Sequence, residues 1–106
     1  MKSDKEILQE ALQILQERGF TQGSYAKDSH GQPVQWDDPN ACSFCSSGAL
    51  HKACGDQSYA HSFSSRYSYV LGLLDKNSDL GCIIQTNDKL GLDAVIRAFQ
   101  QTIAKL

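Results

Sequence analysis

The fold is decided first by residues 3–19, SDKEILQEALQILQERG. Ser3 followed three residues later by Glu6 is the capping-box pattern that begins a helix. Apolar residues then recur at helical spacing, with Gln and Glu residues on the opposite side. These apolar positions are Ile7, Leu8, Ala11, Leu12 and Leu15. Gly19 ends the pattern, because glycine readily adopts the left-handed conformation found after a helix. We therefore expect an amphipathic helix that packs on a core.

The C-terminal part carries the clearest amphipathic pattern of the chain. Its apolar positions are Leu92, Val95, Ile96, Phe99, Ile103 and Leu106. Their recurrence at helical spacing predicts a helix that buries one face. Asn87 and Asp88 precede it, and both residue types are favoured at helix N-caps. We therefore predict that these two residues begin the last helix.

Between these helices the pattern indicates turns and shorter elements. Residues 28–31, DSHG, are typical of a tight turn, and residues 32–34 favour an edge strand after it, which predicts a small β-hairpin. A short helix is expected over residues 49–54, preceded by the stretch Ser46-Ser47-Gly48, capped by a serine and ended by Gly55. A third helix is expected from Ser58 to Asn77. Residues 80–84, LGCII, are short and rich in β-branched side chains, which favours a buried extended segment.

These elements together predict an α+β fold that is mainly helical. About four helices are expected, with a small β-hairpin after the first helix. No internal repeat or long linker interrupts the pattern, and a length of 106 residues fits one domain spanning residues 1–106.

Charge and hydropathy exclude several classes of protein. Ten Lys and Arg residues against twelve Asp and Glu residues give a net charge of −2, which argues against a nucleic-acid-binding surface. No apolar run approaches the roughly 20 residues of a membrane helix, so no membrane association is expected. Residues 1–6, MKSDKE, lack the apolar core of a secretory signal. We expect a cytoplasmic protein whose cysteines stay reduced.

The middle third of the chain differs in composition from the rest. Between Cys42 and Ser68 lie eight of the twelve serines and three of the four cysteines, but only three formally charged residues. Few charges and many hydroxyls make a poor surface for a phosphate backbone and a suitable lining for a small polar ligand. The alternative is that small residues there allow helices to pack closely.

Three short stretches carry recognisable motifs in a definite order. They are Gly19-Phe20-Thr21-Gln22-Gly23, the segment FCSSGAL at residues 44–50, and Thr86-Asn87-Asp88. Together they resemble an uncharacterised family of small bacterial and phage proteins, a domain of unknown function. The pattern of that family runs G-W-x-Q-G, then W-C-x-x-G-A-L, then W-N-D.

The resemblance covers most of the chain, and it departs from the pattern where Trp is favoured. The departures are Phe20, Phe44 and Thr86. The resemblance directs attention to Cys45, Gly48, Asn87 and Asp88. It implies no established activity.

The cysteines and one histidine form a candidate metal site. Cys42, Cys45, His51 and Cys54 follow the spacing C-x2-C-x5-H-x2-C, which supplies the donor set of a tetrahedral zinc site. Bound zinc would stabilise a small domain. Against this, Cys54 falls on the apolar face of the expected helix. A second interpretation is a redox pair, in which a helix dipole acidifies the first thiol, Cys42.

Nucleophilic catalysis is a third interpretation of the same region. Cys45 lies just before an expected helix, where the helix dipole favours the thiolate. Its candidate partners, a general base and the group that orients the base, are His30, His51, His61, Asn87 and Asp88. This interpretation predicts a cysteine-dependent hydrolase or transferase.

A structural role explains each of these residues when it is considered alone. Cys45 and Cys54 fit as small buried side chains, and Cys42 and Cys82 as buried or partly exposed ones. Asn87 with Asp88 fits as a helix cap. This role is the first expectation for each residue taken singly.

Further polar and aromatic residues are candidates for a binding surface. They are Tyr25, Trp36, Ser46, Ser47, Tyr59 and Arg66. Aromatic side chains with polar atoms are common in such surfaces, and Trp36 lies in an expected loop. The alternative for Trp36 is that it covers the core at the hairpin.

The leading hypothesis is a small non-enzymatic protein that binds a protein partner or a small polar ligand stoichiometrically. The resemblance implies an accessory or inhibitor protein of a phage or mobile element, of the anti-defence type. The alternatives are the enzyme that uses Cys45 and a zinc-stabilised interaction domain. No cofactor is expected outside the zinc alternative, and a homodimer is left open.

Overall fold

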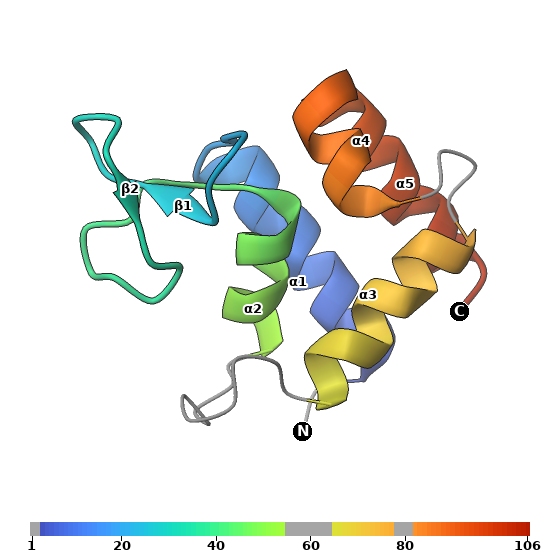
Figure 1. Cartoon of the computed structure of the whole chain (residues 1–106). Coiled ribbons are helices and arrows are strands. Elements are labelled where there is room, and N and C mark those ends of the chain that lie inside the picture. Colours follow the sequence, from blue (N-terminus) through green and yellow to red (C-terminus); the bar gives the residue numbers. More distant parts are fainter. Residues whose placement is uncertain (1–2, 55–64, 78–81) are drawn as a thin grey trace.

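Helices and short strands follow one another along the chain largely as the apolar spacing indicates. The computed structural model describes residues 3–54, 65–77 and 82–106. In order, the elements are α1 (Asp4–Glu17), β1 (Ala26–Lys27), β2 (Pro33–Val34), β3 (Ser43–Phe44), α2 (Ser46–Cys54), α3 (Ser65–Asn77), α4 (Ile83–Leu90) and α5 (Leu92–Ala104). The mainly helical α+β class is confirmed (Figure 1), but the described part has five helices rather than four.

Helix α1 begins and ends as its sequence predicts. Ser3 Oγ accepts a hydrogen bond from the Glu6 N–H at 3.1 Å, and Glu6 Oε1 accepts one from the Ser3 N–H at 2.9 Å. These two bonds complete the capping box. Gly19 follows the last turn with φ of +137°, which residues with a side chain rarely adopt. The buried face consists of Ile7, Leu8, Ala11 and Leu15.

The expected hairpin is present and is part of a three-stranded sheet. β1 pairs with β2 across a turn in which the Asp28 carboxylate accepts the backbone N–H groups of His30 and Gln32. The hydrogen bond from Gln32 is the main reason that the pKa of Asp28 is lowered. β1 also pairs with β3, so the strand order is β2-β1-β3. The sequence pattern does not predict β3, because a strand of two residues has no period to detect.

Two expectations near the C-terminus are wrong. Ile83 is not extended but begins α4, and its N–H donates to the Asp75 carboxylate of α3 at 2.8 Å. Asn87 and Asp88 lie inside α4, while α5 follows Gly91, which has φ of +89° and provides no side-chain cap. A carboxylate from another helix thus satisfies one of the first N–H groups of α4, and local spacing cannot reveal such a partner.

Parts of two expected elements lie outside the described residues. These parts are residues 55–64 and 78–81. Ser58 as a helix cap, and Leu80 and Gly81 as extended residues, therefore stay predictions. Within the described residues, the third helix spans Ser65–Asn77.

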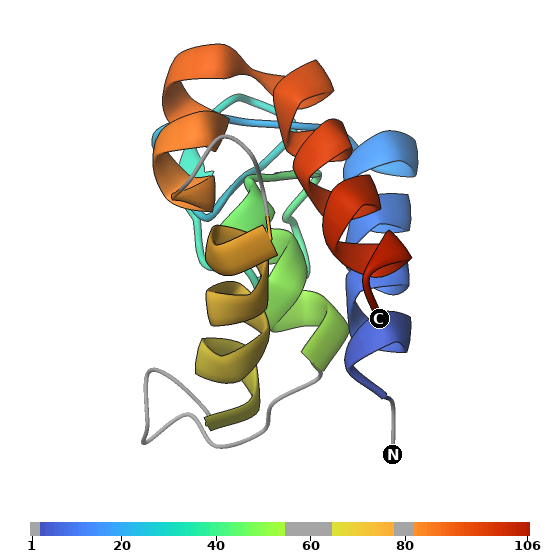
Figure 2. The same ribbon diagram turned by 90° about the vertical axis from the view of Figure 1, so that its right-hand side faces the viewer.

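The core lies between the helices, with α5 beside α1 and α3 beside α2 (Figure 2). The largest fully buried side chains are Phe44, Phe99, Ile7, Leu8, Leu15, Leu50, Leu74, Ile83, Val70, Val95 and Asn87. Leu106, expected to face inward, is 48% exposed because α5 ends at Ala104. Asn87 is the polar member of this buried set, and it leads to the candidate site.

Candidate functional site

Three stretches that are far apart in the sequence meet at the N-terminus of α2. They are the loop after α1, the first turn of α2 and the middle of α4. The Gln22 side-chain N–H donates to the Asn87 carbonyl at 2.9 Å, and the Gly23 N–H donates to Asp88 Oδ1 at 3.1 Å. The structure thus brings together the stretches on which the family resemblance was recognised.

We name this contact the polar junction, formed by Gln22, Gly23, Ser46, Asn87 and Asp88. The Asn87 side chain is 1% exposed. Its Oδ1 accepts the Ser46 N–H at 2.7 Å, and its Nδ2 donates to the Thr21 carbonyl at 3.2 Å and to Asp88 Oδ1 at 3.0 Å. Because Ser46 begins α2, the amide satisfies an N–H that the helix itself leaves free. Asn87 therefore acts at a helix start as its residue type suggests, but the helix is α2 and not α5.

Cys45, rather than a serine, occupies the position before α2. Its carbonyl accepts the Ala49 N–H at 2.9 Å and its Sγ accepts the Gly48 N–H at 3.3 Å, as expected for an N-cap residue. Burial raises the pKa of the thiol, the Gly48 N–H opposes this effect, and the Asp88 carboxylate contributes a smaller increase. These contacts correct the expected serine cap and place a neutral thiol at the start of α2.

Gly48 allows the loop after α1 to approach the first turn of α2. A Cβ atom at this position would overlap the backbone carbonyl oxygen of Tyr25. The same carbonyl accepts the Cys45 N–H at 3.1 Å. The C-x-x-G motif therefore has two structural roles. Cys45 supplies the sulfur that accepts a hydrogen bond at the start of α2, and Gly48, one turn later, leaves room for the Tyr25 backbone.

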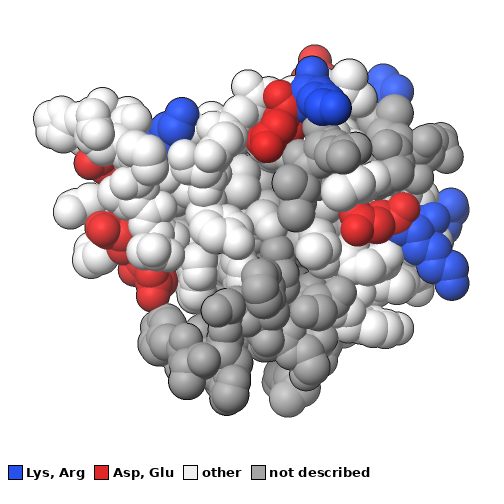
Figure 3. All heavy atoms as spheres, viewed as in Figure 1, with Lys and Arg blue, Asp and Glu red and all other residues white. Residues whose placement is uncertain are grey.

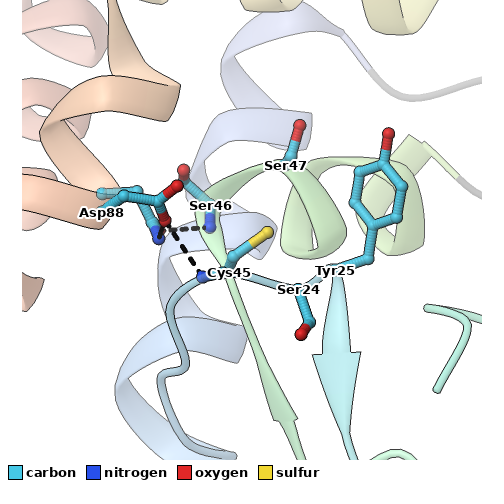
Figure 4. A pocket seen from close by; sticks show the side chains of 8 residues that line it. Ser24, Tyr25, Cys45, Ser46, Ser47 and Asp88 are labelled. Carbon is cyan, nitrogen blue, oxygen red and sulfur yellow. Dashed lines mark hydrogen bonds between the residues drawn. The ribbon is translucent and has the colours of Figure 1, made fainter. Parts of the chain in front are cut away.

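A pocket of about 330 Å³ lies beside the polar junction (Figure 4). Its lining residues are Gly23, Ser24, Tyr25, Cys45, Ser46, Ser47, Asn87 and Asp88. In Figure 4 the Cys45 thiol stands between Asp88 on one side and Tyr25 on the other. Ser46 is fully buried, and its Oγ has no hydrogen-bond partner within the described residues. Because buried hydroxyl groups nearly always have a partner, this one needs an explanation.

Most of the lining residues are ones that the sequence suggests as candidates. The candidates found here are Tyr25, Cys45, Ser46, Ser47, Asn87 and Asp88. Gly23 and Ser24 are the two lining residues that residue type does not predict. For Gly23 the available signal is its place in the stretch that carries the family resemblance. Ser24 has no comparable signal, because nothing local marks its side chain.

His51 lies in an aromatic stack and is not among the residues that line the pocket. Its ring is nearly parallel to that of Trp36, with centroids 5.4 Å apart, and edge-on to that of Tyr25 at 5.6 Å. His51 is 3% exposed and Trp36 is half-buried. The arrangement favours a packing role for both rings over a general base at His51 or a free partner anchor at Trp36.

The four candidate zinc ligands do not converge. Cys42 is exposed and its Sγ donates to the Asn40 carbonyl at 3.4 Å, whereas Cys45 is buried and Cys54 half-buried. Among the residues that the structure describes, no three His, Cys, Asp or Glu side chains are arranged to hold a metal ion. Cys42 also precedes β3 instead of a helix, so the redox interpretation loses the dipole that it invokes.

The remaining candidates are not brought to the pocket by any described contact. His30 is exposed in the hairpin turn. Arg66 lies in α3, but its side chain is not among those described. Tyr59 and His61 fall outside the described residues and stay predictions.

Few formally charged residues lie at the pocket or on the face of the molecule shown in Figure 3. On the face shown in Figure 3, charged side chains stand in small separate groups with uncharged residues between them. Asp88 is the one formally charged residue among the described residues that line the pocket. Within the described ranges, no helix has both the length and the apolar character needed to cross a membrane.

Comparison with known proteins identifies a family that has no assigned activity. No curated protein and no solved structure matches the chain. The match to the family extends over residues 1–105. The chain therefore belongs to DUF6197, a family of unknown function.

Proposed function

We propose that this protein is a non-enzymatic binding module that holds a small polar ligand in the pocket beside the polar junction. The observation that supports the proposal is the buried Ser46 hydroxyl. Both polar atoms of the neighbouring Asn87 side chain have partners, whereas Ser46 Oγ has none within the described residues. A buried hydroxyl without a partner destabilises the folded protein by about 1–3 kcal/mol. A ligand that donates to or accepts from Ser46 Oγ would remove that cost.

The dimensions of the pocket set the size of the ligand. A volume of about 330 Å³ is at the lower end of the range for small-molecule sites. The lining combines small side chains with hydroxyl, thiol and carboxylate groups, which suits one short polar molecule or one protruding side chain. A protein partner would therefore be recognised at this pocket through a single inserted group.

The state of Cys45 supports binding over catalysis. The thiol is 8% exposed, and burial raises its pKa, so little thiolate forms at neutral pH. Its Sγ already accepts a hydrogen bond from the Gly48 N–H. The phage or mobile-element setting, the inhibitor role and the cytoplasmic location stay predictions from the sequence.

A titration followed by NMR tests the proposal. The ¹⁵N-labelled full chain is titrated with separate small alcohols, amides, amines and carboxylates. We expect at least one class to shift the amide signals of Gly23, Ser46, Ser47 and Gly48 saturably. Ser46→Ala should weaken this binding, and the control Ser29→Ala, in the hairpin turn, should not. Absence of a saturable response in this region for every class would overturn the proposal.

A second measurement separates binding from turnover. After prolonged incubation, mass spectrometry should recover the bound compound unchanged. Iodoacetamide should label the exposed Cys42 and Cys82 much faster than Cys45 at neutral pH, because Cys45 is buried. Chemical conversion of the compound that Cys45→Ala abolishes, together with fast labelling of Cys45, would establish the enzymatic alternative instead.

A further inference from the structure

We infer that the ligand of this pocket carries an ammonium group, held between the Asp88 carboxylate, the Ser46 hydroxyl and the ring of Tyr25. This inference rests on the proposed function and specifies the class of ligand. It is carried by the charge of the lining, by the acceptors that stay unused and by the position of an exposed aromatic ring.

Asp88 sets the electrostatic preference of the pocket. It supplies the one formal charge among the described lining residues. Its hydrogen bonds from the Gly23 N–H and from Asn87 Nδ2 both go to Oδ1. Within the described part of the chain, Oδ2 therefore remains able to accept from a ligand. The carboxylate also contributes to the raised pKa of Cys45, so its field reaches the thiol inside the pocket.

The first turn of α2 does not compensate for this negative charge. A helix N-terminus normally attracts anions through its free N–H groups and its dipole. Here the Ser46 N–H donates to Asn87 Oδ1 and the Gly48 N–H donates to Cys45 Sγ. These two donors are already used by the protein. An anionic ligand would therefore meet the Asp88 carboxylate with few donors to offset the repulsion.

Ser46 and Tyr25 complete a site for a cation with N–H donors. Ser46 Oγ is a buried acceptor without a partner in the described residues. Tyr25 is 41% exposed, lines the same pocket, and presents a ring on the side opposite Asp88 (Figure 4). An ammonium group donates several hydrogen bonds and is attracted to aromatic rings. It can therefore use the carboxylate, the hydroxyl and the ring together.

Three probes of similar size test the charge preference. Propylammonium, propanol and propionate are titrated separately into the full chain, with pocket amide shifts as the readout. We expect propylammonium to bind at least about tenfold more tightly than propanol, because a charged hydrogen bond is stronger than a neutral one. Propionate should bind most weakly. Added salt should weaken only the propylammonium affinity, since salt screens an exposed carboxylate.

Matched variants connect this preference to the named residues. Asp88→Asn keeps Oδ1 as an acceptor but removes the charge, and it should reduce the propylammonium affinity about tenfold while changing the propanol affinity less than twofold. Asp93→Asn removes an exposed carboxylate from α5 and is the control. Tyr25→Leu should weaken propylammonium binding about two- to fivefold.

The source of the ammonium group is distinguished by one further probe. Nα-acetyl-lysine methylamide presents the amine as a partner protein would. Tighter binding of this compound than of propylammonium assigns the site to a lysine of a protein partner, and equal or weaker binding assigns it to a free amine.

The outcomes separate this inference from the proposed function. Propanol or propionate binding as tightly as propylammonium, or an Asp88→Asn variant with unchanged preference, would overturn the inference and leave the binding module standing. Failure of every polar compound to bind would overturn both.

Discussion

The apolar layer between α1 and α5 and the polar junction at the start of α2 are both buried, but different interactions specify them. In the apolar layer, side chains such as Leu8 and Phe99 are fully buried and need only fill the available volume. In the polar junction, the Asn87 amide meets Ser46 and Thr21 at 2.7 and 3.2 Å. Hydrogen bonds require direction as well as distance. Substitutions in the polar junction should therefore lower the free energy of unfolding more than comparable substitutions in the apolar layer.

The largest effect is expected beside the polar junction, where the backbones of Gly48 and Tyr25 approach closely. Gly48→Ala should lower the free energy of unfolding by about 3 kcal/mol or more, at the upper end of overpacking effects, because the new Cβ would overlap the Tyr25 carbonyl. Urea denaturation measures this change. Gly72→Ala in α3 is the control, since no atom lies within 4 Å of a Cβ at that position, and it should stabilise the protein by about 0.5–1 kcal/mol. Equal effects of the two substitutions would contradict the close approach at Gly48.

The next effect compares two substitutions that keep the number of heavy atoms in the side chain. Asn87→Leu should lower the free energy of unfolding by about 2–4 kcal/mol, because the Ser46 N–H and the Thr21 carbonyl lose their partner in a buried site. Leu8→Met in the apolar layer should cost less than about 1.5 kcal/mol. Chemical denaturation of both variants gives the comparison. A smaller loss for Asn87→Leu than for Leu8→Met would remove the distinction between the regions.

A smaller effect is expected from the thiol at the start of α2, and it depends on pH. Because the pKa of Cys45 in the folded chain is raised above its ordinary value of 9.0, the unfolded chain loses its proton first. The free energy of unfolding should therefore fall as the pH rises above about 9. Cys45→Ser keeps a cap acceptor and should remove this fall, while Cys42→Ser at an exposed site should not. Denaturation between pH 7 and 11 tests both, and an unchanged fall in Cys45→Ser would assign the alkaline loss to another group.

The smallest effect on stability should come from Ser46, a residue that we expect to contribute to ligand binding. Ser46→Ala removes a buried hydroxyl that has no partner in the described residues, so the melting temperature should stay unchanged or rise. The same variant should bind the pocket ligand less tightly. A loss of several kcal/mol would instead mean that the hydroxyl has a structural partner, which would contradict a ligand at this position.

The helices could be predicted largely from local sequence. The capping box at Ser3, the stop at Gly19 and the apolar face of α5 each follow from residues within a few positions of one another. The start of α4 could not be predicted in this way, because its first N–H donates to Asp75 in α3. β3 could not be predicted either, since it is two residues long and pairs with β1, the first strand of the hairpin, and not with β2, which precedes it in the sequence.

The candidate site was predictable in its residues but not in their roles. Cys45, Asn87 and Asp88 were recognisable as chemically capable groups, and all three line one pocket. Their residue types suggested a reactive thiol and a cap for the last helix. In the structure the thiol of Cys45 is buried. The Asn87 amide serves the start of α2, through a contact between residues about 40 positions apart along the chain.

By itself, the sequence determined the amphipathic faces, the helix ends marked by Ser3 and Gly19, and the small, weakly charged composition of the middle third. Only the tertiary structure decided that Asn87 serves α2, that Cys45 is a buried cap and that Ser46 is left without a partner in the described residues. Periodicity and capping act over a few residues, so a sequence displays them directly. The partners of a buried polar group are chosen by the packing of distant elements, and only the folded chain shows which group is satisfied.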